Sequence, residues 1–89
     1  MAQVIWTDGA LADIGRITDH IRRDSPRAAE RIADRLIAAG DRLDEFPDVG
    51  RAIRSPLREL RTVFPYVIRY RIDGEVVTVL RVRHGARRP

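Results

Sequence analysis

The sequence contains neither cysteine nor lysine among its 89 residues. Without cysteine, disulfide bonds and thiolate metal sites are excluded. No apolar run approaches the roughly 20 residues that a membrane-spanning helix needs. The first residues have neither the basic segment nor the long apolar segment of a signal peptide. We therefore expect a cytoplasmic protein that does not contact a membrane, and we expect neither a metal nor a cofactor.

The residues that are present suit one folded domain. Hydrophobic residues make up 44% of the chain and charged residues 34%, a balance that argues against general disorder. A chain of 89 residues is too short for two ordinary domains, so residues 1–89 are interpreted as a single domain. A domain of this size is only marginally stable alone, so a bound partner would stabilise it.

Positive charge is concentrated in the last third of the chain. Residues 1–56 carry nine arginines and ten acidic residues (net −1), and residues 57–89 carry eight arginines and three acidic residues (net +5), which together give +4. Such a field attracts anionic partners, whether nucleic acid, a nucleotide or an acidic polypeptide. The exclusive use of arginine has a second explanation, the codon usage of a GC-rich genome.

The first half of the chain predicts a strand followed by a helical hairpin. Residues 3–7 are rich in β-branched and aromatic side chains, which is typical of a strand. From residue 9 to about 24 the apolar residues recur with helical spacing, and Thr7 or Asp8 is a suitable N-cap. Ser25 and the following proline then end this helix and begin a second one, over residues 26–45. So short a turn implies that the two helices are antiparallel.

The second half predicts an antiparallel sheet. Residues 47–56 are interpreted as a loop, and residues 57–64, 66–72 and 75–83 as three strands. Asp73-Gly74 between the last two strands is a strong hairpin signal. The fold class is therefore α+β, with an N-terminal strand, an antiparallel helical hairpin and a three-stranded antiparallel meander.

Alternation of side chains along the strands predicts one apolar and one mixed face. The apolar face should cover the helices and includes Leu60 and the even-numbered residues of the last two strands. The opposite face would combine Glu59 and a group of arginines with a floor of valines. This interpretation assigns to the outward face Glu59, Arg61, Val63, Val67, Arg69, Arg71, Val77, Val79, Arg81 and Arg83. Such a face fits a partner that is partly apolar and partly acidic, although one solvated polar face is also ordinary for an antiparallel sheet.

The ordered set of these segments resembles the ParE/RelE toxins of bacterial toxin–antitoxin pairs. The resemblance covers essentially the whole chain and is carried by VIWT at 4–7, ALADI at 10–14, EFPDVGR at 45–51, RELR at 58–61, YVIRYRI at 66–72, DG at 73–74 and VLRVRHGARR at 79–88. It implies the fold described above and a toxin that a cognate antitoxin neutralises. We expect the antitoxin's C-terminal segment to lie along the helical hairpin and to cover part of the sheet.

Two activities are known on this fold, so the fold alone does not choose between them. RelE-like members cleave messenger RNA in the ribosome, whereas ParE-like members poison DNA gyrase without being nucleases. RelE-like cleavage uses an arginine directly after the tyrosine of the third predicted strand and a C-terminal tyrosine; here Val67 follows Tyr66, and the C-terminal tyrosine is missing. Arg61 and Arg87 could replace two other cationic groups of a nuclease.

These departures favour a gyrase-binding toxin that is not an enzyme and has no catalytic residue, with a ribosome-dependent endoribonuclease as the alternative. A third, weaker reading is a decayed toxin that retains only antitoxin binding. His84 would be the acid or base of a nuclease, although a histidine at a strand end is more often structural. Charge and side-chain alternation give the candidate contact residues Arg58, Arg61, Arg69, Arg71, Arg81, Arg83, Arg87 and Arg88.

Overall fold

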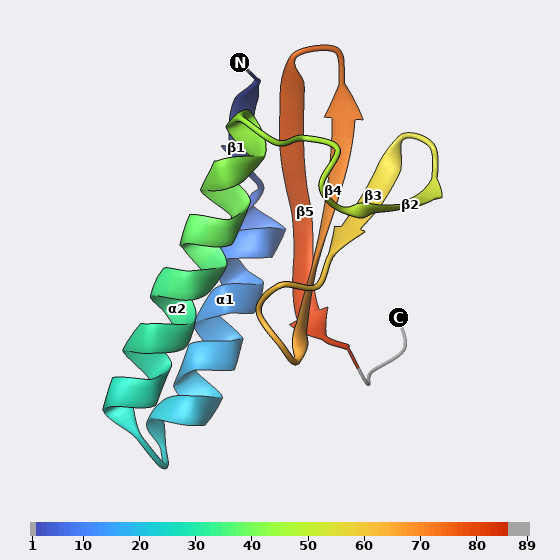
Figure 1. Ribbon diagram of the computed structural model, residues 1–89. Helices are drawn as coiled ribbons and strands as arrows, with labels where there is room; N and C mark the ends of the chain where they lie inside the picture. Colours follow the sequence, from blue (N-terminus) through green and yellow to red (C-terminus); the bar gives the residue numbers. More distant parts are fainter. Residues whose placement is uncertain (1, 86–89) are drawn as a thin grey trace.

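A five-stranded sheet with a helical hairpin packed beside it forms the protein (Figure 1). The computed structural model describes residues 2–85, so Arg87 and Arg88 lie outside the described residues. The elements are β1 (Gln3–Trp6), α1 (Asp8–Arg22), α2 (Pro26–Asp41), the short 3-10 helix η1 (Arg42–Asp44), β2 (Arg51–Arg54), β3 (Leu57–Leu60), β4 (Tyr66–Asp73) and β5 (Val76–His84). The predicted α+β class and the order of strand, two helices and antiparallel strands are confirmed.

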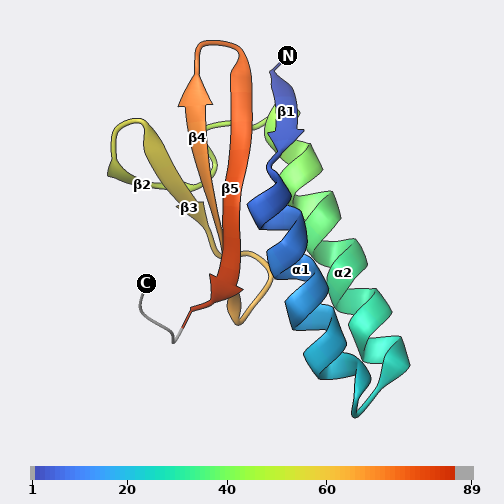
Figure 2. The ribbon, with the colours of Figure 1, turned by 180° about the vertical axis from the view of Figure 1, so that it is seen from behind.

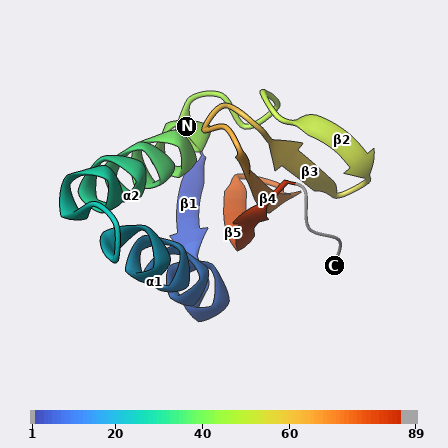
Figure 3. The ribbon, with the colours of Figure 1, turned by 90° about the horizontal axis from the view of Figure 1, so that it is seen from below.

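Side-chain caps define where both helices begin. The Thr7 hydroxyl accepts a hydrogen bond from the backbone N–H of Ala10 at 3.1 Å, and the Ser25 hydroxyl accepts one from Ala28 at 3.1 Å. Each cap satisfies a backbone donor that the first helical turn leaves unpaired. The helix α2 ends at Asp41, earlier than predicted, and the chain continues as η1. Viewed from below, α1 and α2 lie side by side at one end of the sheet (Figure 3).

The strand order is β1-β5-β4-β3-β2. The first strand pairs in parallel with the last, and all other neighbours are antiparallel. Figure 2 shows β1 beside β5 and directly above the start of α1. Thr7 links the start of α1 to β5. Its hydroxyl proton is shared between the carbonyl oxygens of Val79 (3.0 Å) and Leu80 (3.1 Å).

Residues 47–56 contain a strand that the sequence did not predict. Within this presumed loop β2 pairs antiparallel with β3, so that Arg51 lies opposite Glu59. All four β2 residues are exposed, and a short exposed edge strand has no buried face to impose an alternating pattern. The predicted strand 57–64 was too long, because β3 ends at Leu60 and a turn precedes Tyr66. Val63 in that turn packs in the core, so its outward assignment was wrong.

A β-bulge in β5 reverses the predicted alternation for half of that strand. Arg69 lies opposite Arg81, whereas the next β4 residue, Tyr70, lies opposite Val79, so Leu80 has no partner of its own in β4. One extra residue shifts the side-chain period by one position. Val77 and Val79 therefore face the core and are fully buried, contrary to the prediction. The run of residues 76–80 is apolar or β-branched throughout, so its sequence carries no sign of the shift.

The core lies between the helical hairpin and the inner face of the sheet. Its largest fully buried side chains are Tyr70, Leu36, Leu43, Ile68, Val77, Val79 and Val82. Trp6 of β1 packs against this core, and its indole ring contacts α2 at Gly40. A Cβ atom at residue 40 would overlap the ring. The indole Nε1 donates to Asp41 at 3.0 Å, which fixes the ring across the helix. The close approach of β1 to α2 therefore requires glycine at residue 40, which has no side chain.

Candidate functional site: the outer sheet face and the α2 groove

The outer face of the sheet is organised around one carboxylate. Glu59 is 8% exposed and accepts from Arg69 Nη2 at 2.8 Å and from Arg61 Nη2 at 3.3 Å. Arg83 Nη2 lies 3.8 Å from the same carboxylate. We call these four residues the Glu59 cluster. Burial alone would raise the pKa of Glu59, but the hydrogen bond from Arg69 and the three positive charges lower it below its ordinary value, so the carboxylate is ionised.

Strand register explains why these four residues meet. Glu59 of β3 lies directly opposite Arg69 of β4. Val67, two residues before Arg69, lies opposite Arg83 of β5 and is 4% exposed. Neighbouring side chains on one face of an antiparallel pair are within reach of long residues. The predicted outward positions of Glu59, Arg69 and Arg83 agree with this register, and the predicted valine floor is reduced to Val67.

The other candidate arginines do not join this cluster. Arg71 pairs with Asp73 at 2.7 Å on an exposed part of β4. Arg58 lies opposite Tyr70, on the inner side, and donates to the Gly50 carbonyl oxygen at 2.7 Å. The described candidates therefore divide into a clustered group of Arg61, Arg69 and Arg83 and a separate group of Arg58, Arg71 and Arg81.

Arg81 is directed to α1 by Asp13. The Asp13 carboxylate is nearly buried and accepts from Arg81 Nε at 2.8 Å and from the Val82 backbone N–H at 2.9 Å, and Arg16 also donates to it. Burial alone would raise the pKa of Asp13, but the bonds from Arg81 and Val82 and the charge of Arg81 lower it. Sequence reasoning missed this link. The sequence does contain one indication of this link. Asp13 is an acidic residue on the apolar stripe of the first predicted helix, four positions before Ile17.

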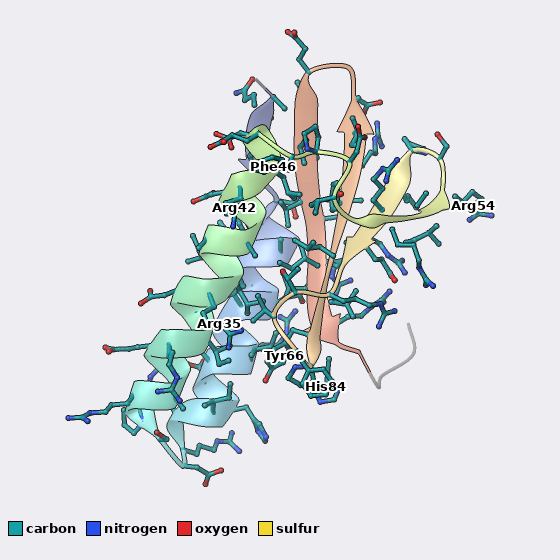
Figure 4. The ribbon with its side chains drawn as sticks, in the orientation of Figure 1. Arg35, Arg42, Phe46, Arg54, Tyr66 and His84 are labelled. Atoms are coloured by element: carbon teal, nitrogen blue, oxygen red, sulfur yellow. The ribbon has the colours of Figure 1, made fainter. Side chains whose placement is uncertain are left out.

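His84 lies at the end of β5 against Tyr66. The two rings meet edge to face with centroids 5.8 Å apart, and Figure 4 shows both side chains together at the lower end of the sheet. They line a cleft of about 680 Å³ between α1 and β5, which also includes His20. The edge-to-face contact packs His84 against Tyr66.

A second and more apolar hollow lies between α2 and β3. This α2 groove has a volume of about 320 Å³, and its lining is formed by Arg35, Ala38, Ala39, Arg42, Leu43, Phe46, Val49, Leu60 and Thr62. Phe46 is 50% exposed and Val49 58% exposed. The guanidinium of Arg42 lies 5.6 Å from the centre of the Phe46 ring. Figure 4 shows Arg35, Arg42 and Phe46 along α2 and its C-terminal end, whereas Arg54 lies at the far end of the molecule.

The α2 groove was not predicted from the sequence. Phe46 was taken only as the residue that stops the second helix, and Val49 as part of a loop. An exposed aromatic side chain beside exposed aliphatic ones is the usual mark of a docking surface. Val77 and Val79, which the sequence assigned to an exposed apolar surface, are in the core instead, whereas Phe46 and Val49 at the groove are exposed.

Within residues 2–85, no group of three or more histidine or acidic side chains is placed to hold a metal ion. None of the helices in that range is both long and apolar enough to cross a bilayer.

The fold and the outer face define a small toxin of the ParE/RelE superfamily. A family model described as ParE toxin of type II toxin-antitoxin system, parDE, matches residues 4–89. The chain belongs to this family. Its membership implies a cognate antitoxin as partner.

Similar proteins carry both names of the superfamily. Toxin RelE2 of Caulobacter vibrioides is 52% identical over 87 residues, which cover 98% of this chain and 99% of the relative. Toxin ParE3 of the same organism is 36% identical, with 96% of this chain and 88% of the relative covered. A solved structure titled "Chromosomal ParDE TA system from P. aeruginosa" superposes with a TM-score of 0.79 at 24% identity, covering 94% of this chain and 96% of that one. At that identity the likeness shows the fold alone.

Proposed function

We propose that this protein is a ParE-like toxin that acts by binding DNA gyrase and that has no catalytic residue. It would form one domain over residues 1–89 and act in the cytoplasm, where gyrase works. The observation that carries the proposal is the arrangement of side chains on the outer face of the sheet. Its arginines are held by Glu59, and the position after Tyr66 is a buried valine, Val67.

RNA cleavage requires cationic groups around the scissile phosphate and a pair of groups that move protons. Of the arginines on the outer face, Arg69 and Arg83 are largely covered, with side chains 27% and 23% exposed, and both face Glu59. An arginine at residue 67 would project from the same face, but the valine there is 4% exposed and has no ionisable group. This face is therefore better suited to stabilising the sheet than to phosphate chemistry.

A ribosome-dependent endoribonuclease remains the second candidate. The observation in its favour is the name of the relative that is 52% identical, Toxin RelE2. The cleft that contains His84 and Tyr66 is the place where such chemistry would be sought.

One experiment separates the two candidates. The protein is expressed under tight control, plasmid supercoiling by gyrase is assayed, and transcript ends are mapped in the same cells. We expect loss of supercoiling with intact transcripts. Cuts in phase with codons and normal supercoiling would favour the nuclease, and a toxin with no effect on growth, supercoiling or transcripts would favour a decayed copy.

We further propose that an apolar segment of the antitoxin, flanked by acidic residues, docks in the α2 groove. Most of the side chains that line the groove are apolar, and Arg35 and Arg42, which also line it, attract negative charge. The chain offers a matched pair of variants, because its two phenylalanines are both exposed but only Phe46 lines the groove. Phe46→Ala should weaken antitoxin binding by about tenfold or more, as for an aromatic anchor in an interface. Phe64→Ala, at a side chain that is 85% exposed, should leave the affinity within about twofold; equal losses would place the contact elsewhere.

A further inference from the structure

The Glu59 cluster resembles an anion-binding site in which the bound anion is a side chain of the protein, the Glu59 carboxylate. Its three guanidinium groups come from different parts of the sheet: Arg69 from β4, Arg83 from β5 and Arg61 from the residue directly after β3. All three are directed at one carboxylate, with contacts of 2.8, 3.8 and 3.3 Å. Three positive charges around one negative charge leave an excess of two.

Guanidinium groups bind carboxylates and phosphates with the same geometry, through N–H donors directed at two oxygens of the anion. In this cluster Arg69 donates to Glu59 Oε2 through both Nε and Nη2, at 3.3 and 2.8 Å. Both donors converge on this one oxygen, and Arg61 donates to the other, Oε1, so the Glu59 carboxylate already occupies N–H groups that a phosphate would use. A phosphate that used these donors of Arg69 would have to displace a carboxylate that is only 8% exposed.

We propose that Glu59 determines the ligand class of the outer face, by acting as an internal counter-anion that excludes the phosphates of RNA. The inference deepens the proposed function and rests on it, because a toxin that binds a protein target gains nothing from a phosphate site. The ordinary alternative is that Glu59 serves only to hold the strands together. Both ideas expect a loss of stability when Glu59 is neutralised, but only ours expects a gain in RNA affinity.

The test compares two variants with the same change in net charge. Glu59→Gln removes the charge inside the cluster and keeps the shape of the side chain, whereas Glu75→Gln removes an exposed charge at the β4–β5 hairpin. Binding of a fluorescently labelled single-stranded RNA is measured by anisotropy at several salt concentrations, on the full-length proteins. Circular dichroism verifies that each variant is folded.

We expect E59Q to bind the RNA about tenfold more tightly than the wild type. Its plot of log affinity against log salt should steepen by about 0.7, the value for one additional phosphate contact on a single strand. E75Q should stay within about twofold of the wild type, because Glu75 makes none of the ion pairs of the Glu59 cluster. The proposal is overturned if E59Q and E75Q have the same affinity, or if only stability changes.

The wild-type protein supplies an independent test that does not depend on the folding of E59Q. The side-chain N–H signal of Arg69 is followed by nitrogen-15 NMR while the same RNA is added. An unchanged signal supports a guanidinium held by Glu59, and a shift that saturates with RNA overturns the proposal. Failure here is distinguishable from failure of the proposed function, because supercoiling and transcript cleavage are measured with the unmodified toxin and without this comparison.

Discussion

The hydroxyl of Tyr70 fastens the segment that precedes β2 to the inner face of the sheet. It donates to the Pro47 carbonyl oxygen at 2.7 Å and accepts from the Gly50 backbone N–H at 2.8 Å. Tyr70 is fully buried, and burial raises the pKa of its hydroxyl above the ordinary value, so the group is neutral and able to donate. Tyr70→Phe removes both hydrogen bonds while keeping the ring.

The two bonds do not contribute equally. Gly50 is buried, so its N–H would be left without a partner, at a cost of about 1–3 kcal/mol. The Pro47 carbonyl is partly exposed and water can replace the hydroxyl, so only the net value of a hydrogen bond, about 1 kcal/mol, is lost there. We expect Tyr70→Phe to lower the free energy of unfolding by about 3 kcal/mol, out of a total of roughly 4–13 kcal/mol for a chain of this size.

Urea and thermal unfolding provide the measurement. For a small domain, the loss should lower Tm by roughly 12–24 °C. Tyr66→Phe is the control, because Tyr66 is the chain's other tyrosine and is half-buried at the sheet's end. If Tyr70→Phe unfolds at the same urea concentration as Tyr66→Phe, the hydroxyl does not hold this segment.

The remaining predictions concern Asp13 and two glycines. Because the pKa of Asp13 is lowered in the folded protein, its stabilisation is present above the ordinary pKa of 3.8 and is lost as pH falls below it. Asp13→Asn should therefore cost about 2 kcal/mol in urea unfolding at pH 7, and its difference in stability from the wild type should narrow as the pH falls below 3.8; a constant difference would refute the ion-pair explanation. Gly40→Ala should lower the unfolding free energy by about 1–3 kcal/mol, because the new Cβ overlaps Trp6. Gly15→Ala in the middle of α1 meets nothing within 4 Å and should instead stabilise by about 0.5–1 kcal/mol, so the same sign for both would contradict this packing.

The helical hairpin was predictable because its signals are local. The cap at Ser25 and the proline after it act within one helical turn, and the apolar stripe repeats over several turns. The strand β2 was not predictable, because its residues are exposed and its only support is the pairing with β3. Although only two residues separate β2 from β3, the exposed residues of β2 lack the alternation of apolar and polar side chains that marks a half-buried strand.

In the candidate site too, some positions could be predicted from local sequence and others could not. Glu59 and Arg69 were placed on one face correctly, because β3 and β4 pair without a register shift between Leu57 and Leu60. Arg81 lies opposite Arg69, as alternation predicts, but its guanidinium pairs with Asp13 of α1 instead of joining the Glu59 cluster. This pairing cannot be read from alternation along one strand.

The bulge also explains why Val77 and Val79 are not on the outer face, where the sequence placed them. Without the extra residue, Val77 and Val79 would lie among the arginines of the outer face, and an apolar partner would be needed to cover them. With it, both valines enter the core, and the Val82 N–H donates to Asp13 at 2.9 Å. On the outer face Glu59 pairs with its surrounding arginines, and the exposed apolar groups of the described chain include Phe46 and Val49 at the α2 groove. A single inserted residue in β5 therefore separates the apolar docking surface from the arginine face, and the two can be tested by different variants.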